Sequence, residues 1–228
     1  MNFDLNFLIK NQTILNIRGN TLNITEYGCI STGLLEGLMN KELEIDKKLY
    51  YFNTKDRYSV YDFSNVLFDL IQKNINKKRQ VVFLCIGSDR ATGDCLGPIV
   101  GYKLEKLQKS NIILYGTLEK PVHAKNLHDT MDHINQYHRN ALVIAIDASL
   151  GKSAHIGYIT VGEGPLLPGA GVDKNLPPVG DIFITGIVNF SGMLDHMLLQ
   201  TTRLNIVMIL ADYICKGINY CFYKLNQR

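Results

Sequence analysis

Two aspartates occupy positions where they could carry out acid–base chemistry. Asp94 lies in a short polar loop after one apolar run, and Asp147 ends a second apolar run in the segment AIDAS. If the two runs are neighbouring parallel strands, their carboxyl ends face one crevice, and the two carboxyl groups could lie within several ångströms of each other. Two close acids have pKa values that move apart, so one stays ionised while the other holds a proton, which suits hydrolysis by activated water.

The same two residues also have a purely structural interpretation. Asp94 comes at or just before the start of an expected helix, where an acid satisfies free N–H groups and meets the positive end of the helix dipole. On this interpretation Asp94 is a helix cap and Asp147 is an ordinary loop acid. The spacing of the residues alone favours neither interpretation over the other.

Three further side chains could contribute to a site at this edge. Asp89 and Thr92 belong to the same loop as Asp94. His123 follows the next expected strand and could reach the same edge as an acid, a base or a ligand, although a lone loop histidine is more often a surface residue. Cys95 is a minor candidate for a nucleophile, since a helix start lowers the pKa of a thiol.

The other motifs give little support to a metal or phosphate site. His128, His133 and His138 recur every five residues, which puts them on different faces of a helix and makes poor geometry for a metal. Gly87 and Gly93 give the first loop a glycine-rich character, but neither GxGxxG nor the GxxxxGK motif is present. We therefore expect no cofactor, and a divalent metal is only weakly supported.

The elements that must position the acids are most clearly defined in residues 81–101. Residues 81–86 form an apolar run typical of a strand buried on both faces, and the polar loop leads into a helix with Pro98 in its first turn. Ser59 with Asp62 resembles a capping box at the start of an earlier helix. Further strands are expected at residues 112–115, 141–146, 156–161 and 181–188, and a further helix after Asn126. The alternation of strands and helices predicts a parallel sheet with right-handed crossovers.

The two ends of the chain have patterns of their own. Residues 1–48 are expected to form an N-terminal extension or extra layer, with a hairpin around residues 18–20, and residues 49–228 the α/β domain. The apolar pattern of the C-terminal segment is too long for one ordinary helix, so we expect a break near residues 200–203. Residues 162–180 form a long Gly/Pro loop of the kind that usually acts as a lid or binding loop.

The composition is that of an ordinary soluble globular protein. The chain has 228 residues, of which 46% are hydrophobic and 20% charged, and its net charge of +3 is too small to indicate nucleic acid or a membrane surface as a partner. The chain shows neither a signal-peptide pattern nor a run of 18 apolar residues, so we expect neither a signal peptide nor a membrane span. Five scattered cysteines without a CxxC pair indicate reduced thiols and a cytoplasmic protein.

Several blocks of the sequence, in the right order, resemble a known family. These blocks are IGSDRATGDCLGPIVG, GTLEKPVHAKNL, AIDASLG, VGEGPLLPGAGVDKNLPPVGDIFITGIVN and LLQTTRL. Between about residues 50 and 216 the chain resembles the YyaC family of sporulation proteins of spore-forming bacteria. That family is similar to the spore germination protease and, more remotely, to the hydrogenase maturation proteases. The resemblance implies a three-layer α/β/α fold of the phosphorylase/hydrolase-like type with a mostly parallel central sheet.

The resemblance also implies a peptidase-like site. In the germination protease one essential aspartate lies in a segment shaped like GDCLGP, where Asp94 stands here, and a second ends a strand before a small residue, as Asp147 does. In the hydrogenase maturation proteases, acids at these places help to hold a metal together with a histidine from a later loop. Residues 162–189 contain no histidine, so the metal-independent pair of aspartates fits this chain better.

We therefore predict an aspartate-dependent hydrolase, an endopeptidase of the developing or germinating spore, located in the cytoplasm of the mother cell or forespore or in the spore interior. Asp94 and Asp147 are the expected catalytic pair. The expected substrate-binding residues are Asp89, Thr92, His123, Asn126 and Asn189. The expected partner is a protein or peptide substrate, and a homo-oligomer is an open option. The alternatives are a catalytically silent protein that binds a peptide or anion in the same crevice and, with less support, a divalent-metal hydrolase.

Overall fold

The computed structural model describes residues 14–17, 20–23, 49–75, 80–106, 112–168, 176–192 and 194–227. The chain divides into two compact units, Met1–Asp46 and Lys47–Arg228. In the first unit β1 (Ile14–Ile17) and β2 (Asn20–Asn23) pair antiparallel, which confirms the predicted hairpin pairing. The rest of residues 1–48 lies outside the described residues, so its function as an extra layer stays a prediction.

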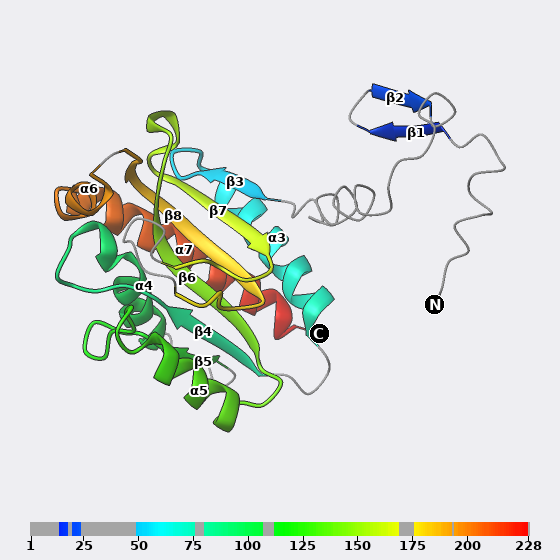
Figure 1. Ribbon diagram of the computed structural model, residues 1–228. Helices are drawn as coiled ribbons and strands as arrows, with labels where there is room; N and C mark the ends of the chain where they lie inside the picture. The colour runs from blue at the N-terminus through cyan, green and yellow to red at the C-terminus, as the bar shows by residue number, and fades with distance from the viewer. Residues whose placement is uncertain are drawn as a thin grey trace. The chain divides into compact units, whose positions relative to one another are not determined.

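A six-stranded mixed sheet forms the centre of the second unit (Figure 1). Its strands, in chain order, are β3 (Tyr50–Asn53), β4 (Val81–Cys85), β5 (Ile112–Tyr115), β6 (Leu142–Gly151), β7 (Tyr158–Glu163) and β8 (Ile182–Phe190). The order across the sheet is β3-β7-β8-β6-β4-β5. The pairs from β8 to β5 are parallel, whereas β7 and β3 are added antiparallel at one edge. The predicted α/β fold with a mostly parallel sheet is confirmed.

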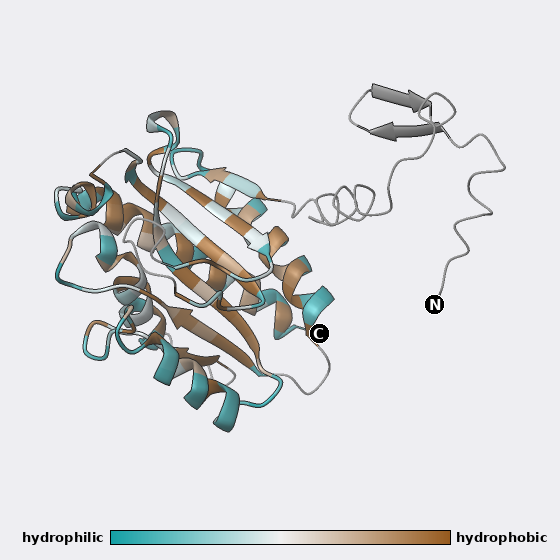
Figure 2. Ribbon diagram, viewed as in Figure 1, coloured by the Kyte–Doolittle hydropathy of each residue, from teal (hydrophilic) through white to brown (hydrophobic). Residues whose placement is uncertain are grey.

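Helices cover both faces of this sheet. They are α3 (Ser59–Asn74), α4 (Leu96–Glu105), α5 (Leu127–Tyr137), α6 (Asp195–Gln200) and α7 (Leu204–Leu225), with short 3-10 turns η2 (Gly93–Cys95) and η3 (Ser153–His155). Side chains alternate along β4: Phe83 joins the core formed with α3, α4 and α7, and Leu84 joins the core formed with α5. Figure 2 shows the central strands as hydrophobic and the exposed side of α5 as hydrophilic. These layers confirm the predicted α/β/α arrangement.

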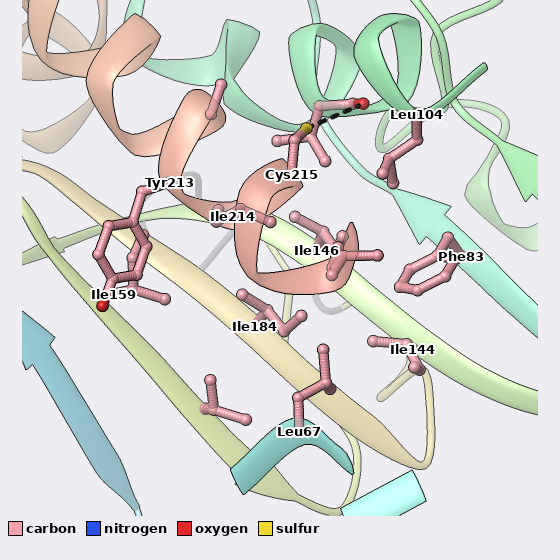
Figure 3. Packing of buried hydrophobic residues seen from close by; sticks show 14 of the residues in the cluster. Leu67, Phe83, Leu104, Ile144, Ile146, Ile159, Ile184, Tyr213, Ile214 and Cys215 are labelled. Carbon is pink, nitrogen blue, oxygen red and sulfur yellow. Dashed lines mark hydrogen bonds between the residues drawn. The ribbon is translucent and has the colours of Figure 1, made fainter. Parts of the chain in front are cut away.

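The helix α7 lies at the centre of the core that the sheet forms with α3 and α4. Figure 3 shows Ile214 above the strand residues Ile146 and Ile184, and all three side chains are fully buried. The thiol of Cys215 lies 3.8 Å from the carbonyl oxygen of Val100, which links α7 to α4. By length and composition alone α7 could cross a membrane, but 56% of its apolar window is buried inside the domain, as in the core helix of a soluble protein.

Two predictions about helix ends have different outcomes. The break expected near residues 200–203 is confirmed, because α6 ends at Gln200 and α7 begins at Leu204. The capping box at Ser59 is wrong, since Ser59 is the first helical residue of α3 and no side chain caps that helix. The Ser59 hydroxyl instead lies 2.7 Å from the hydroxyl of Tyr213 and 2.7 Å from the carbonyl oxygen of Asn53. These contacts tie α3 to α7 and to the end of β3.

Candidate active site

The two aspartates come from elements at the topological switch point of the sheet, where successive crossovers place β5 and β6 on opposite sides of β4. From β4 the chain crosses through α4 to β5 at one edge, and it then returns through α5 to β6 on the other side of β4. The helices of these two crossovers lie on opposite faces of the sheet. The carboxyl ends of β4 and β6 therefore flank the position at which open α/β sheets bind ligands.

The strand β6 carries Asp147 just past the end of β4. The last pair between the two strands is Cys85 with Ile146, whereas β6 continues along β8 as far as Gly151. The prediction that Asp147 ends its strand is therefore wrong, because β8 supplies a pairing partner for the residues that follow. Relative to the shorter β4, however, Asp147 lies one position beyond the last pair, so it still borders the crossover position.

Asp94 is held against the end of β4 by close backbone packing. Gly87 has a φ of 140°, and a Cβ there would lie 2.0 Å from the carbonyl oxygen of Asp94. The N–H of Ser88 donates to the same oxygen at 3.2 Å. Further on, a Cβ at Gly97 would lie 1.9 Å from the carbonyl oxygen of Ile86. The absence of side chains at these two glycines lets η2 and α4 approach the strand and fixes Asp94 at its end.

Asp94 lies in η2, directly before α4, where the sequence predicted it. Neither η2 nor α4 has a side-chain capping hydrogen bond at its start. The N–H of Ser88, in the preceding loop, lowers the pKa of Asp94. The structural interpretation, in which Asp94 is an N-cap, is therefore wrong, because the chain enters α4 through a 3-10 turn that needs no side-chain cap.

Asp147 is the buried acidic residue among those that the structure describes, with 7% of its surface exposed. Burial raises the pKa of Asp147 well above its ordinary value, and the nearby charge of Asp94 raises it further. The N–H of Ala148 donates to the Oδ1 atom of Asp147 at 2.7 Å and opposes this effect. The turn η2, which carries Asp94, packs against β6, which carries Asp147, so the two acids come from adjoining elements.

The half-buried Asp94 has a more balanced environment. Burial raises its pKa, while the backbone N–H of Ser88 and the charges of His123 and His196 lower it. Among the described residues, the influences on the pKa of Asp147 are its burial, the charge of Asp94 and the N–H of Ala148. The pKa of Asp147 is raised further than that of Asp94, so a single proton shared by the pair favours Asp147.

His123 lies at the same edge as the two acids. The residue before it, Val122, accepts a hydrogen bond from the N–H of Gly87 at 2.8 Å, which fixes this loop against the turn after β4. The side chain of Asn126 accepts from the N–H of His123 at 2.8 Å and donates to the carbonyl oxygen of Pro121 at 3.0 Å. The amide of Asn126 is thus used to shape the loop that presents His123.

Asn189 has a comparable function at the end of β8. Its amide donates to the carbonyl oxygen of Leu198 at 3.0 Å and so ties α6 to the strand. The helix α6 in turn packs on η2, because a Cβ at Gly93 would lie only 3.0 Å from the carbonyl oxygen of Leu199. This packing brings His196 of α6 near Asp94. The sequence interpretation missed His196, although its place soon after the fifth strand was a usable signal.

The remaining predicted residues belong to the loop that carries Asp94. Asp89 is exposed and Thr92 is half-buried. Cys95 is buried, and its thiol lies 3.4 Å from the carbonyl oxygen of Ala91. Burial, followed by the charges of Asp89 and Asp94, raises the pKa of Cys95. The hypothesis of an activated Cys95 thiolate is therefore wrong, because its environment disfavours the thiolate.

The described side chains around the two acids give no support to a metal centre. Across the described ranges, no group of three or more His, Cys, Asp or Glu side chains is arranged to hold a metal ion. The two acids and two imidazoles therefore do not make up such a donor set, and the divalent-metal alternative lacks support from the geometry. The donors that are present suit proton transfer instead.

The long loop between β7 and β8 is closed at its base. The backbones of Leu166 and Val179 exchange two hydrogen bonds, of 2.8 and 2.9 Å. Both side chains belong to or pack on the core that α5 forms with the sheet. Residues 169–175 lie outside the described residues, so the expected function of this loop as a lid or binding loop stays a prediction.

Comparisons with known proteins match most of the second unit. A family model described as "Protein of unknown function (DUF1256)" matches residues 51–217, a range that contains both acids and both histidines of the site. The "Uncharacterized protein YyaC" of Bacillus subtilis (strain 168) is 44% identical over 169 residues, which cover 74% of this chain and 82% of that protein. The crystal structure of a NiFe hydrogenase maturation protease, HycI from Thermococcus kodakarensis KOD1, aligns with a TM-score of 0.41 and 16% identity. That alignment covers 68% of this chain and 99% of the other.

Proposed function

The chain belongs to the family of YyaC-like proteins (Protein of unknown function, DUF1256), and we propose that it is a hydrolase that uses a pair of aspartates to cleave peptide bonds. One observation carries the proposal: burial raises the pKa of both Asp94 and Asp147, and it raises the pKa of Asp147 further, so the two acids are unequal partners for a proton. A protonated acid next to a carboxylate is the pair that hydrolysis by activated water requires.

Each acid then has its own function in the reaction. The carboxylate of Asp94 takes a proton from a water molecule while the water oxygen forms a bond to the carbonyl carbon of the substrate. The carboxyl group of Asp147 gives its proton to the leaving amide nitrogen as the C–N bond breaks. The cycle leaves the proton on Asp94, and its return to Asp147 restores the starting state.

The choice of a peptide as the substrate, and of the spore as its setting, rests on the resemblance of the sequence blocks to the germination protease. Among the residues expected to bind substrate, Asp89 and Thr92 lie in the loop of Asp94, which is consistent with contact to a substrate. The amides of Asn126 and Asn189 are already engaged in hydrogen bonds to their own loops, so we propose that they position His123 and α6 instead.

The proposal is tested by replacing each acid with its uncharged counterpart. The purified protein is incubated with a mixed peptide library, and cleavage is followed by mass spectrometry. We expect Asp94→Asn and Asp147→Asn each to lower the cleavage rate by about 10²–10⁴-fold, the usual contribution of a general acid or base. Circular dichroism is used to check that both variants stay folded.

Asp132→Asn is the matched control, because Asp132 lies on α5 and its side chain is 68% exposed, in a pair with His128. This variant is expected to cleave at the wild-type rate. Cleavage that survives in both active-site variants would falsify the assignment of the pair. A wild-type protein that binds peptides but cuts none would point to the catalytically silent alternative.

A further inference from the structure

Three buried polar side chains lie side by side across the sheet. Asp147 on β6 is paired with Thr185 on β8, and Thr185 is paired with Thr160 on β7. Residues that are paired on neighbouring strands point to the same face of a sheet, so the three side chains form one row. Each of them is at most 7% exposed. Because an unpaired polar group is costly in a protein interior, such a row requires its own hydrogen bonds.

The row lies on the face of the sheet that carries α5, at the margin of the core there. Ile146 and Ile184 directly precede Asp147 and Thr185 and belong to the core around α7 (Figure 3), so Asp147 and Thr185 point to the opposite face. Among the described residues, the hydrophobic cluster that α5 forms on that face includes residues of β4 and β6 but none of β7 or β8. The face therefore changes from hydrophobic to polar at Asp147, and the two threonines extend the candidate site along the sheet.

The hydroxyl of Thr185 receives two other hydroxyls. The Ser149 hydroxyl donates to the Oγ1 atom of Thr185 at 3.2 Å, and the Oγ1 atom of Thr160 lies 2.6 Å from the same atom. Thr160 has no other side-chain hydrogen bond to a described residue, so its proton is paired only if Thr160 donates to Thr185. The Thr185 oxygen then accepts two hydrogen bonds, and its own proton is left for a third group.

The neighbouring acceptor on this row is the carboxyl group of Asp147. Its Oδ1 atom accepts from the N–H of Ala148 at 2.7 Å, and no hydrogen bond from a described residue reaches its Oδ2 atom. Neighbouring strands lie about 4.8 Å apart, so a rotation of the carboxyl group towards β8 would bring Oδ2 to the Thr185 hydroxyl. We propose that Thr185 is a positioning residue whose hydroxyl donates a hydrogen bond to Asp147 when that carboxyl group is ionised.

This hydrogen bond would stabilise the carboxylate that remains after Asp147 has given its proton to the leaving group. That consequence rests on the proposed function, whereas the hydrogen bond itself does not. The charged group that acts on Asp147 from the described residues is Asp94 of η2. Its surroundings contain the other ionisable side chains of this edge, which are Asp89, Arg90, Cys95, His123 and His196. The substitutions that test the proposal leave all of these groups in place.

The direct test is a carbon-13 NMR titration of the Asp147 carboxyl group in the intact protein. Thr185→Val removes the hydroxyl but keeps the shape of the side chain, so the midpoint should move to higher pH by about one to two units, as expected for the loss of a hydrogen bond to a charged group. Thr185→Ser keeps the hydroxyl and should leave the midpoint near the wild-type value. Ser59→Ala is the matched control, because it removes a buried, hydrogen-bonded hydroxyl on α3, at the other face of the sheet.

The titration separates this inference from the proposed function because it needs no turnover. An Asp147 midpoint that stays in place in Thr185→Val, or that moves equally in Thr185→Ser or Ser59→Ala, overturns the inference even if peptides are cleaved. A midpoint that moves only when the hydroxyl of residue 185 is removed supports it even if no peptide is cleaved. Should Thr185→Val not fold, Thr185→Ala removes the same hydroxyl with a smaller side chain and is expected to give the same direction of shift.

Discussion

Asp147 is an ionisable side chain that the fold buries, and this burial has a consequence for stability. Because its pKa is raised, the folded protein binds more protons than the unfolded chain between the ordinary aspartate pKa of about 3.9 and the raised pKa. The free energy of unfolding therefore falls as the pH rises through that range. Asp94, whose pKa is also raised, contributes in the same direction.

We accordingly predict that Asp147→Asn, which should slow the proposed cleavage, stabilises the protein at neutral pH. The variant removes the ionisable group but keeps an oxygen that can accept from the N–H of Ala148. Its melting temperature at pH 7 should exceed that of the wild type, and the difference should shrink towards pH 4, where the wild-type acid is neutral. Calorimetry across this pH range measures the effect. A lower melting temperature at pH 7 would show that the buried carboxylate is stabilising after all.

Functional sites often carry residues that are unfavourable for stability, and the proposed catalytic function of this pair is consistent with that rule. The sequence located both acids because each follows an apolar run, and it located His123 for the same reason. The sequence could not show which of the two acids has the higher pKa. Which acid holds the proton depends on burial and on neighbouring charges from β6 and α6, and neither quantity is encoded in the local sequence.

The close contact between α4 and the end of β4 positions Asp94, and this contact depends on the absence of a side chain at Gly97. We predict that Gly97→Ala destabilises the protein by at least about 1–3 kcal/mol, the usual cost of overpacking. The added Cβ would lie 1.9 Å from the carbonyl oxygen of Ile86, which is part of the backbone and cannot rotate away. Urea-induced unfolding measures the loss, and the variant should also lose activity because η2 moves with α4.

Gly192→Ala is the matched control for this prediction. A Cβ at Gly192 would have its nearest neighbours 3.9 Å away, in the side chains of Leu198 and Phe190, which is ordinary contact. Its stability should stay within about 0.5 kcal/mol of the wild type, as for most surface substitutions. Equal losses in the two glycine variants would mean that the close approach at Gly97 is not the cause.

Helix ends show the limit of local patterns. The capping-box pattern at Ser59 is present in the sequence, yet the hydroxyl is used to join α3 to Tyr213 of α7 and to the end of β3. A buried hydroxyl needs hydrogen-bond partners, and the Ser59 hydroxyl finds them in Tyr213 and Asn53 rather than in the first turn of its own helix. The break before Leu204 was predictable, since it depends only on the length of the apolar pattern.

The protein as a whole has its described hydrophobic cores entirely in the second unit. Both clusters of buried side chains begin at Phe52 or later in the chain. We therefore predict that a variant beginning at Lys47 keeps the melting temperature of the full chain, in agreement with the proposed division between residues 1–48 and 49–228. Calorimetry of the two proteins makes the comparison. A marked fall in the melting temperature would show that the N-terminal segment contributes to the stability of the domain.

Most of the fold could be predicted because its signals are local. Continuous apolar runs located β4, β5 and the first part of β6, and the alternation of strands and helices predicted the parallel crossovers and hence the shared edge of Asp94 and Asp147. In β4 and the first part of β6 such patterns arise from burial on both faces of a parallel sheet, whereas β5 is a half-buried edge strand.

Other features were decided only when distant segments met. The strand β6 extends past Asp147 because β8 pairs with it. The strand β7 runs antiparallel to both of its neighbours, β8 and β3, and this direction is defined only by the pairing. The helix α6 lies against η2, the turn that carries Asp94, because Gly93 lets Leu199 approach. Pairing, burial and electrostatic proximity are relations between residues far apart in the chain, so no short segment of the sequence contains them. These relations give the two aspartates different pKa shifts.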